Sequence, residues 1–326
     1  MANHWLNGLH VANGQQDMVA AHSVGFKCFT FLNGQHNDML PLLGDTSVLS
    51  VMRMYSPGFT TKVPKVLVNS ISQFQDVRHV IPWNEANLGY EVGEPDAEQD
   101  IQWKLWNYSR LERFWDDFLV EFRASPNTQN KTLHFPAWSP WDNSVGPFWA
   151  GADVYDLHLY GSPQEMLSQL DKSLIMIPYE RMVFISEWNF RKPWSLIADS
   201  EVQEFLNGLS ARRRRVLGAT AFIWKWYNPD PEHPNLDIEG TRVAEVLGRW
   251  RPMPEFAGSF IGLAQQLGTE VVGEPVTEIR YNSVKNEDGS FAPGGDIAVQ
   301  YTTKGKMEAV KREDGVWLPP YFFPNS

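Results

Sequence analysis

Between residues 1 and 250, short apolar segments alternate with segments of helical periodicity, and this alternation constrains the fold more than any other feature. The predicted strands are Leu6–Val11, Phe26–Leu32, Leu49–Tyr55, Arg78–Trp83, Thr132–Ala137, Val154–Tyr160, Met182–Trp188 and Ala219–Trp226. The predicted helices include Gln15–Val24, Val63–Gln73, Ile101–Arg123, Pro163–Ser173 and Ser200–Leu217. Strand followed by helix, repeated, indicates parallel pairing. Eight such units in about 250 residues predict an α/β fold of the (β/α)8 TIM-barrel type.

The pattern changes at the sequence "RWRPMPEF", where two prolines end the helix predicted at Thr241–Trp250. One more helix is predicted at Glu255–Leu267. Short strand-like segments follow it, separated by "NEDGS", "TTKGK" and "EDG", which are typical of hairpin turns. The sequence therefore predicts a catalytic barrel over residues 1–250. It predicts a small antiparallel β appendage, packed on the barrel, over residues 251–326.

Charge and cysteine content exclude several classes of function. The net charge of −11 argues against nucleic acid or an anionic membrane as the partner, because no basic face compensates for it. The single cysteine, Cys28, rules out an intrachain disulfide and a multi-cysteine metal site. The first residues, "MANHWLNGLHVANGQQ", lack the pattern of a secretory signal. We therefore expect a cytoplasmic protein, or one that leaves the cell without a signal peptide, and a phage origin would fit this.

Two of the predicted strands run directly into a glutamate. "VIPWNEANLG" contains Glu85 after strand four, and "MVFISEWNF" contains Glu187 at the end of strand seven. The active sites of such barrels lie at the C-terminal ends of the strands, so both carboxylates are expected at the same face. Hydrolysis of a glycoside with retention of configuration requires two carboxyl groups about 5 Å apart across the scissile bond. Two glutamates that face one another across a barrel mouth would suit this chemistry.

Several motifs in strand order resemble those of clan A glycoside hydrolases. "WNEAN" at 83–87 resembles the Asn-Glu-Pro motif that ends strand four in this clan, although Ala86 stands in place of the proline. The resemblance implies that Glu85 is the acid/base and that Asn84 binds the sugar 2-hydroxyl. "ISEWNF" at 185–190 is similar to the strand-seven segment, which implies that Glu187 is the nucleophile.

The resemblance extends to further substrate-binding residues. "DLHLYG" at 156–161 is similar to the strand-six segment, which implies substrate contacts by His158 and Tyr160. "VMRMY" at 51–55 resembles the strand that carries an arginine near the nucleophile, which implies that role for Arg53. A cation there would keep Glu187 ionised. "FIWKWYN" at 222–228 resembles strand eight with its sugar-platform tryptophan.

For the platform, Trp224 is preferred and Trp226 is the alternative. His10, His134 and Trp138 also lie near predicted strand ends and are candidates to line a sugar cleft.

The function implied is a retaining β-glycoside hydrolase that acts on an oligo- or polysaccharide by double displacement, without a metal or other cofactor. A metal-dependent hydrolase would normally show H-x-H on an early strand, and His10 has no second histidine two residues away. The alternative from another class is a catalytically inactive, carbohydrate-binding barrel with a tryptophan-lined cleft. The presence of both glutamates favours the enzyme.

Overall fold

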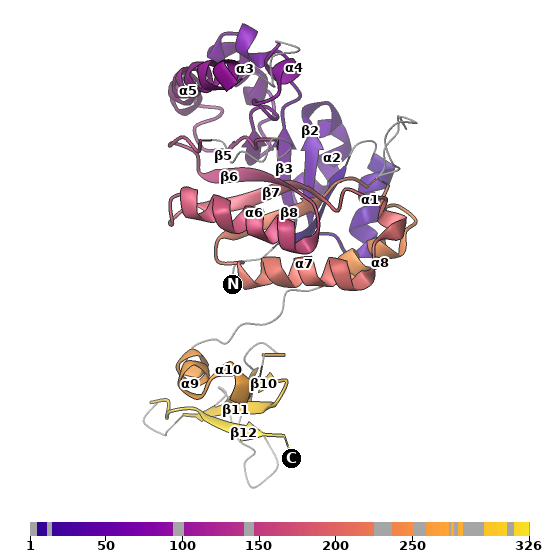
Figure 1. The fold of residues 1–326 in the computed structure, drawn as a ribbon, viewed down its shortest axis with the longest axis vertical. Coiled ribbons are helices and arrows are strands. Elements are labelled where there is room, and N and C mark those ends of the chain that lie inside the picture. Colours follow the sequence, from indigo (N-terminus) through magenta and orange to yellow (C-terminus); the bar gives the residue numbers. More distant parts are fainter. Residues whose placement is uncertain are drawn as a thin grey trace. The chain divides into compact units, whose positions relative to one another are not determined.

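Eight parallel strands close into a barrel in the computed structural model of the chain, and the helices lie around their outside (Figure 1). The strands are β1 (Trp5–Val11), β2 (Cys28–Leu32), β3 (Leu49–Arg53), β4 (His79–Ile81), β5 (Thr132–Phe135), β6 (Val154–Tyr160), β7 (Met182–Asn189) and β8 (Val216–Ala221). Each strand pairs with the next in the sequence, and β8 pairs with β1. The structure describes residues 5–11, 15–93, 101–139, 147–224, 237–250, 259–273, 275–276, 280–282, 297–311 and 316–325.

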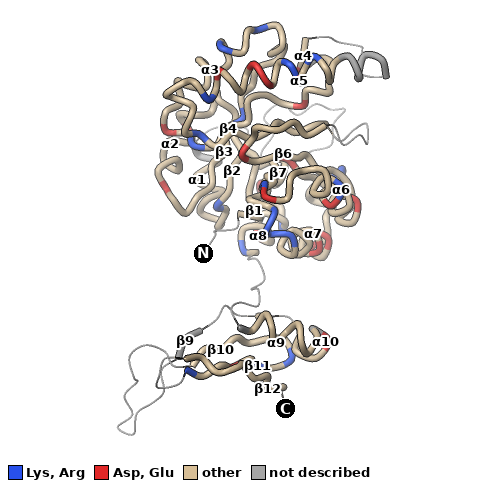
Figure 2. Tube along the Cα trace, turned by 90° about the vertical axis from the view of Figure 1, so that its left-hand side faces the viewer, with Lys and Arg blue, Asp and Glu red and all other residues tan. Residues whose placement is uncertain are grey.

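The helices of the barrel largely follow the predicted pattern. They are α1 (Gln15–Val24), α2 (His36–Leu43), α3 (Pro64–Ser72), α4 (Gly89–Val92), α5 (Ile101–Ala124), α6 (Pro163–Met176), α7 (Asp199–Ala211) and α8 (Arg242–Arg249). Short 3-10 turns lie at Asn33–Gln35, Phe59–Thr61 and Trp194–Leu196. Acidic and basic side chains are interspersed over these helices (Figure 2). None of the helices in the described part of the chain combines the length and apolar character needed to span a membrane.

Alternation along the strands separates two apolar layers. The inward side chains form a small core inside the barrel, made of Cys28, Leu49, Val51, Ile81, Val154 and Phe184. The outward side chains, among them Phe29, Leu157 and Leu159, belong to the larger core between strands and helices. At the C-terminal ends of the strands the inward positions become polar, as with Arg53 in β3 and Tyr160 in β6. The barrel thus places its polar residues at one end.

Several predicted strand boundaries differ from the structure, and two of the differences bear on the site. Strand four ends at Ile81 rather than Trp83, so Glu85 lies in the following loop. Strand eight spans Val216–Ala221 rather than Ala219–Trp226, because the preceding helix ends at Ala211 and not at Leu217. The shift of strand eight changes which aromatic residue lies at its end.

The chain divides into two units, Met1–Arg251 and Pro252–Ser326. In the second unit, α9 (Ser259–Leu267) and α10 (Thr269–Val272) precede a four-stranded antiparallel sheet. Its strands are β9 (Arg280–Asn282), β10 (Ile297–Thr302), β11 (Gly305–Val310) and β12 (Tyr321–Pro324). The second unit has its own hydrophobic core, in which Phe260 and Ala264 of α9 pack against Ala298 and Met307 of the sheet. This arrangement confirms the predicted barrel with a small antiparallel β appendage; the predicted packing of the appendage on the barrel remains a prediction.

Candidate active site

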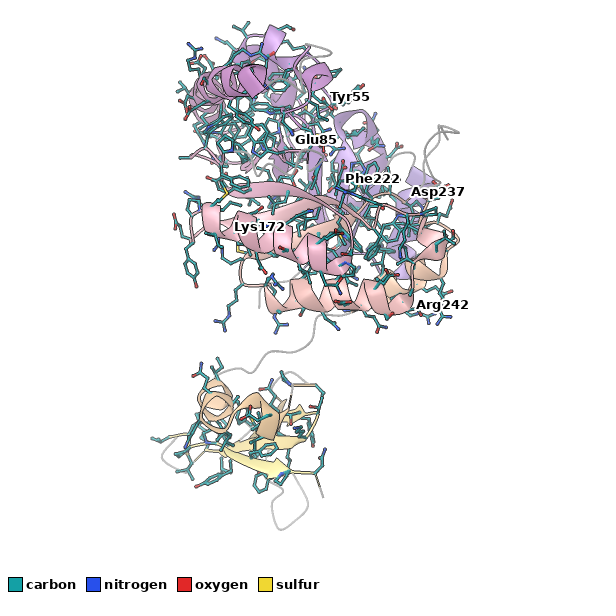
Figure 3. The ribbon with its side chains drawn as sticks, viewed as in Figure 1. Tyr55, Glu85, Lys172, Phe222, Asp237 and Arg242 are labelled. Carbon is teal, nitrogen blue, oxygen red and sulfur yellow. The ribbon has the colours of Figure 1, made fainter. Side chains whose placement is uncertain are left out.

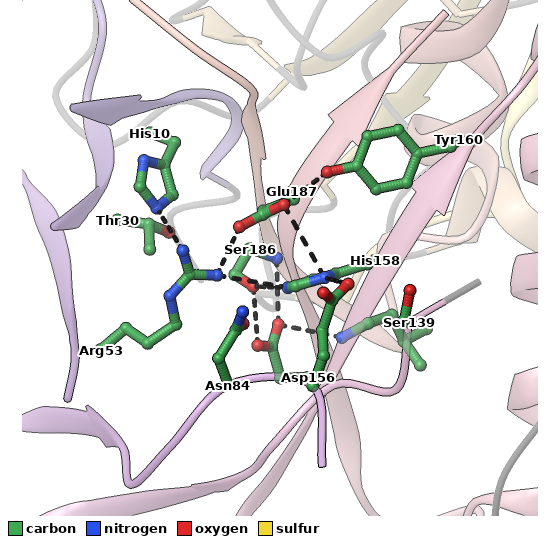
Figure 4. A network of polar contacts seen from close by, with 12 residues as sticks. His10, Thr30, Arg53, Asn84, Ser139, Asp156, His158, Tyr160, Ser186 and Glu187 are labelled. Carbon is green, nitrogen blue, oxygen red and sulfur yellow. Dashed lines mark hydrogen bonds and ion pairs between the residues drawn. The ribbon is translucent and has the colours of Figure 1, made fainter. Parts of the chain in front are cut away.

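A network of buried polar side chains occupies the barrel at the C-terminal ends of its strands (Figure 4). It is built from β1, β3, the loop after β4, β6 and β7. Its members are His10, Arg53, Asn84, Glu85, Asp156, His158, Tyr160, Ser186 and Glu187. The network therefore brings together seven of the residues predicted to form the site: His10, Arg53, Asn84, Glu85, His158, Tyr160 and Glu187.

A bulge in β7 directs Glu187 into the barrel. Ile185 pairs with Leu157 of β6, but His158, the next residue of β6, pairs with Glu187, so Ser186 is an extra residue. Ile185 faces the outer core, and simple alternation would place Glu187 on the same outer face. The extra residue allows Ser186 and Glu187 both to face inward, and Trp188 then returns to the outer core.

Three side chains hold the Glu187 carboxylate. Arg53 donates a hydrogen bond to Oε1, and the Tyr160 hydroxyl donates one to Oε2. The His158 Nδ1 atom lies 3.8 Å from Oε2. Burial acts to raise the pKa of Glu187, but the positive charges of His158 and Arg53 overcome it and hold that pKa far below its usual value. Glu187 is therefore an anion at neutral pH.

His158 links the two glutamates. Its Nδ1 atom lies 2.7 Å from Glu85 Oε1, and its imidazole is completely enclosed. Burial acts to lower the pKa of His158, but the charges of Glu187 and Glu85 raise it to about 9. His158 is therefore protonated at neutral pH and donates a hydrogen bond to Glu85 Oε1.

Behind His158, a hydrogen-bond chain reaches the bulge. His158 Nε2 lies 3.1 Å from Ser186 Oγ, and the Ser186 hydroxyl donates to Asp156 Oδ2 at 2.7 Å. Asp156 Oδ1 accepts the backbone N–H groups of Leu157 and Ser186. Burial raises the pKa of Asp156 to about 6. Asp156 thus fixes the extra residue of β7 and supports the imidazolium at the same time.

A third carboxylate, Glu91 of α4, reaches the site and was not predicted. It is buried, and its Oε1 atom accepts a hydrogen bond of 2.9 Å from Asn84 Nδ2. Burial raises the pKa of Glu91. The only sequence signal for it was its position in the long loop segment after strand four, which gives no indication of a contact with Asn84.

Two buried polar atoms of the network lack a hydrogen-bond partner within the described residues. Arg53 donates to His10 Nε2 at 3.0 Å, and burial, followed by the charge of Arg53, lowers the pKa of His10 to about 3. His10 is therefore neutral and carries its proton on Nδ1. Within the described residues, neither this Nδ1 atom nor Asn84 Oδ1 has a hydrogen-bond partner, although both atoms are buried. A buried unpaired polar group costs free energy, so these atoms are suited to a donor and an acceptor on a ligand.

The aromatic predictions need correction. Trp224 is only 4% exposed and packs in the outer core near Phe26, because strand eight ends at Ala221; the structure does not support it as a sugar platform. Trp226 lies outside the described residues. Phe222 is instead the aromatic next to the network, with its ring 5.2 Å from that of His10 (Figure 3).

The remaining two candidates lie away from the carboxylates. His134 pairs with His79 at a distance of 3.1 Å and packs on Phe184 of the inner core, below the polar network. Trp138 packs against Trp149 on the outer side of the barrel, where it borders a cavity beside α6. In the described part of the chain, no three histidine, cysteine or acidic residues are arranged to hold a metal ion.

No protein-family model matches the sequence, and no curated protein matches it. Solved structures match the fold. Fungal β-1,4-galactanases align with 74% of this chain and 99% of their own, with a TM-score of 0.52 and 11% identity. A broad-specificity GH5-4 endoglucanase from Bacteroides salanitronis aligns over 76% of this chain and 94% of its own, with a TM-score of 0.51 and 11% identity.

Bacteroides uniformis β-glucuronidase 2 covers 99% of this chain, which spans 43% of that enzyme, with a TM-score of 0.55 and 13% identity. At such identities the likeness is one of fold. The chain has the barrel fold of these glycoside hydrolases, which confirms the fold predicted from the clan A resemblance.

Proposed function

We propose that the barrel is a retaining β-glycoside hydrolase in which Glu187 is the nucleophile and Glu85 is the acid/base. The observation that carries this proposal is the position of both carboxylates around one imidazole nitrogen. Glu85 Oε1 and Glu187 Oε2 lie 2.7 Å and 3.8 Å from His158 Nδ1. Because both distances start at the same nitrogen, the two carboxylate oxygens are at most about 6.5 Å apart. Retaining enzymes need a separation of about 5–5.5 Å, whereas inverting enzymes need about 6.5–9.5 Å to admit a water molecule.

The protonation of the site supports the same assignment of roles. A nucleophile must be ionised, and the contacts of Arg53, His158 and Tyr160 keep Glu187 in that form. The acid must deliver a proton at neutral pH, and His158, whose pKa is raised to about 9, holds one 2.7 Å from Glu85 Oε1. Two carboxyl groups whose surroundings differ in this way are typical of an acid and nucleophile pair.

The reaction proceeds in two displacements. A Glu187 oxygen attacks the anomeric carbon, the bond to the glycosidic oxygen breaks, and that oxygen takes a proton from Glu85, which receives it from His158 Nδ1. A water molecule then attacks the anomeric carbon and gives a proton to Glu85, which returns it to His158, and the ester bond to Glu187 breaks. The sugar hydroxyls contact His10 Nδ1 and Asn84 Oδ1, and Phe222 lies against the sugar ring. Oligo- or polysaccharides with β-linkages are the proposed substrates.

Hydrolysis of a panel of aryl β-glycosides tests this function. The wild-type chain should turn over at least one substrate, and Glu187→Gln should lose activity by at least about a thousandfold, since it removes the nucleophile. Glu85→Gln should retain slow turnover of substrates with a good leaving group, and azide should accelerate it by replacing water. Glu112→Gln, an exposed position of α5, is the matched control. Turnover that survives Glu187→Gln would disprove the mechanism.

The same panel separates the enzyme from an inactive carbohydrate-binding barrel. The unpaired donor of His10 and acceptor of Asn84 would serve binding as well as catalysis. Binding of a saccharide without hydrolysis, with every aryl glycoside of the panel left intact, would favour that alternative.

A further inference from the structure

A cavity of about 460 Å³ lies outside the barrel wall, between β6 and α6. Its wall includes Leu157 and Leu159, whose side chains point away from the barrel interior. The position follows from the architecture. The described residues between β5 and β6, namely 136–139 and 147–153, form no helix, although the preceding and following repeats each carry one. Trp138 and Phe148 lie there instead, and the cavity lies between these two residues and α6.

The cavity begins next to the proposed catalytic centre. His158 and Tyr160 border it, and Gln169 of α6 donates a hydrogen bond of 3.3 Å to the Tyr160 carbonyl. From there it runs along α6 between Gln164 and Ser173, which corresponds to ~13 Å of helix. Glu85, Glu187 and Arg53 are not among its lining residues. The cavity therefore shares His158 and Tyr160 with the polar network but does not include its two carboxylates or Arg53.

The lining has the chemistry of a saccharide site. Trp138 and Phe148 supply aromatic surface, and Gln164, Gln169 and Ser168 supply amide and hydroxyl groups. Within the described residues, the buried Oε1 atom of Gln169 has no hydrogen-bond partner. Small-molecule sites typically combine apolar walls with a few such oriented polar groups.

The charges of the lining favour an anionic ligand. Lys172 and Arg191 are both exposed at the cavity, whereas the chain as a whole carries a net charge of −11. Among the described residues, the one acidic residue of the lining is Glu165, which accepts a hydrogen bond from the backbone N–H of Ser162 in the capping box of α6. Its hydrogen bonds with Ser162 and the charge of Arg191 lower the pKa of Glu165. The described lining thus carries two cations and one carboxylate.

We infer that this cavity is a second carbohydrate site that binds an acidic sugar unit, with the sugar ring against Trp138 and Phe148 and its carboxylate at Lys172, which is labelled in Figure 3. The assignment to a saccharide rests on the proposed function. The acidic unit comes either from an extension of the substrate glycan beyond the catalytic centre or from a separate free sugar.

Calorimetric titration of the full-length Glu187→Gln chain tests the site, because this variant should bind without turnover. The probes are a trisaccharide of galacturonic acid and cellotriose, a neutral trisaccharide. The acidic probe should bind more tightly, and salt should weaken its binding. Lys172→Glu should weaken it by about tenfold or more. Ser168→Trp should abolish it by filling the cavity, and Ser168 is exposed, so the fold should tolerate the change. Lys65→Glu, an exposed position of α3, is the charge-matched control.

Equal affinity for the two probes would overturn the inference, as would equal effects of Lys172→Glu and Lys65→Glu. Failure of the acidic probe to bind at millimolar concentration would also overturn it. Kinetics of the active chain, with Glu187 in place, distinguish the two sources of the acidic sugar unit. If the unit is an extension of the substrate glycan, Lys172→Glu should raise KM for acidic glycans and leave KM for aryl glycosides unchanged. If the unit is a separate free sugar, the substitution should leave both KM values unchanged, while the affinity for the acidic trisaccharide still falls. Activity of the Glu187→Gln variant would contradict the proposed mechanism and leave the binding result intact.

Discussion

Arg53 is the residue whose charge bears most directly on the proposed nucleophile. Its guanidinium binds both Glu187 and His10, and all three groups are buried. In Arg53→Met, the pKa of Glu187 should rise, because burial continues to favour the neutral acid while one cation is lost. The acidic limb of kcat/KM should therefore move to higher pH, and activity at neutral pH should fall by about 100-fold.

A pH profile of kcat/KM checks this expectation, with Arg123→Met as the control. Arg123 forms an ion pair with Asp153 on the outside of the barrel and should leave the profile unchanged. An unchanged acidic limb in Arg53→Met would mean that Arg53 does not set the ionisation of Glu187.

Glu91 determines which atom of the Asn84 amide is left without a partner in the proposed site. While Glu91 is ionised it can only accept, so Asn84 presents Nδ2 to it and Oδ1 to the site. Glu91→Ala should release the amide and lower kcat/KM by about tenfold for substrates with a 2-hydroxyl group. For substrates that lack the 2-hydroxyl group, kcat/KM should change little. Glu91→Gln keeps an acceptor, so it should retain most of the preference for substrates with the 2-hydroxyl group.

The ratio of kcat/KM for a 2-hydroxy and a 2-deoxy aryl glycoside measures this effect. Glu112→Ala, on the exposed side of α5, is the control. Equal losses on both substrates would assign Glu91 a purely structural role.

At the scale of elements, the bulge of β7 decides whether the site exists. Asp156 holds the bulge through the backbone and hydroxyl of Ser186, and its charge helps to raise the pKa of His158. An asparagine cannot accept the Ser186 hydroxyl at the Nδ2 position and carries no charge. In Asp156→Asn, the pKa of His158 should therefore fall below about 9. An NMR titration of the histidine ring, with the exposed Asp116→Asn as control, measures the shift; an unmoved pKa would show that Glu85 and Glu187 alone sustain it.

The sequence predicted the elements well and their ends less well. Apolar runs revealed all eight strands, because their side chains pack in the inner or outer core. The end of strand eight was missed because "FIWKW" continues the apolar pattern beyond Ala221, and for the same reason Trp224 and Trp226, but not Phe222, were considered as the platform. The glutamates were found from short motifs, whereas Asp156, Ser186 and Glu91 act through contacts between distant segments. Such contacts leave no local pattern in a single sequence.

A histidine pair between β4 and β5 makes the stability of the barrel depend on pH. His79 Nδ1 and His134 Nε2 share one hydrogen bond, and burial lowers the pKa of His79 to about 4 and that of His134 as well. In the unfolded chain these histidines take up protons near pH 6.5, whereas in the folded chain they stay neutral to lower pH. Protonation therefore favours the unfolded chain below pH 6.5, and the free energy of unfolding decreases as the pH falls from there towards the folded pKa. For His79 alone, the loss between pH 7 and pH 5 is about 2 kcal/mol.

Urea unfolding at the two pH values tests this contribution. In His79→Gln the decrease in the free energy of unfolding between pH 7 and pH 5 should be smaller than in the wild type by that amount. His22→Gln, on α1, should behave as the wild type does. An equal decrease in wild type and His79→Gln would exclude the histidine pair as the origin.

At the scale of the whole molecule, the two units have separate cores of very different size. The barrel contains an outer core shared by its helices and strands and an inner core within the strands. Among the described residues of Pro252–Ser326, the core consists of six buried residues: Phe260, Ala264, Val272, Ala298, Met307 and Ala309. Because a small core supplies little net stability, the second unit should unfold at a lower temperature than the barrel.

Calorimetric unfolding of the full chain should therefore show two transitions, the smaller one at lower temperature. A chain that ends at Arg251 should keep the upper transition and, if the proposed function holds, the turnover of small aryl glycosides, because the polar network lies wholly within Met1–Arg251.

Ala264→Asp, placed in the small core, should lower the temperature of the first transition only, since a buried unpaired charge destabilises the unit that contains it. A single transition in the full chain, together with loss of the barrel fold on truncation, would show instead that the β appendage completes the barrel and that the two cores fold as one.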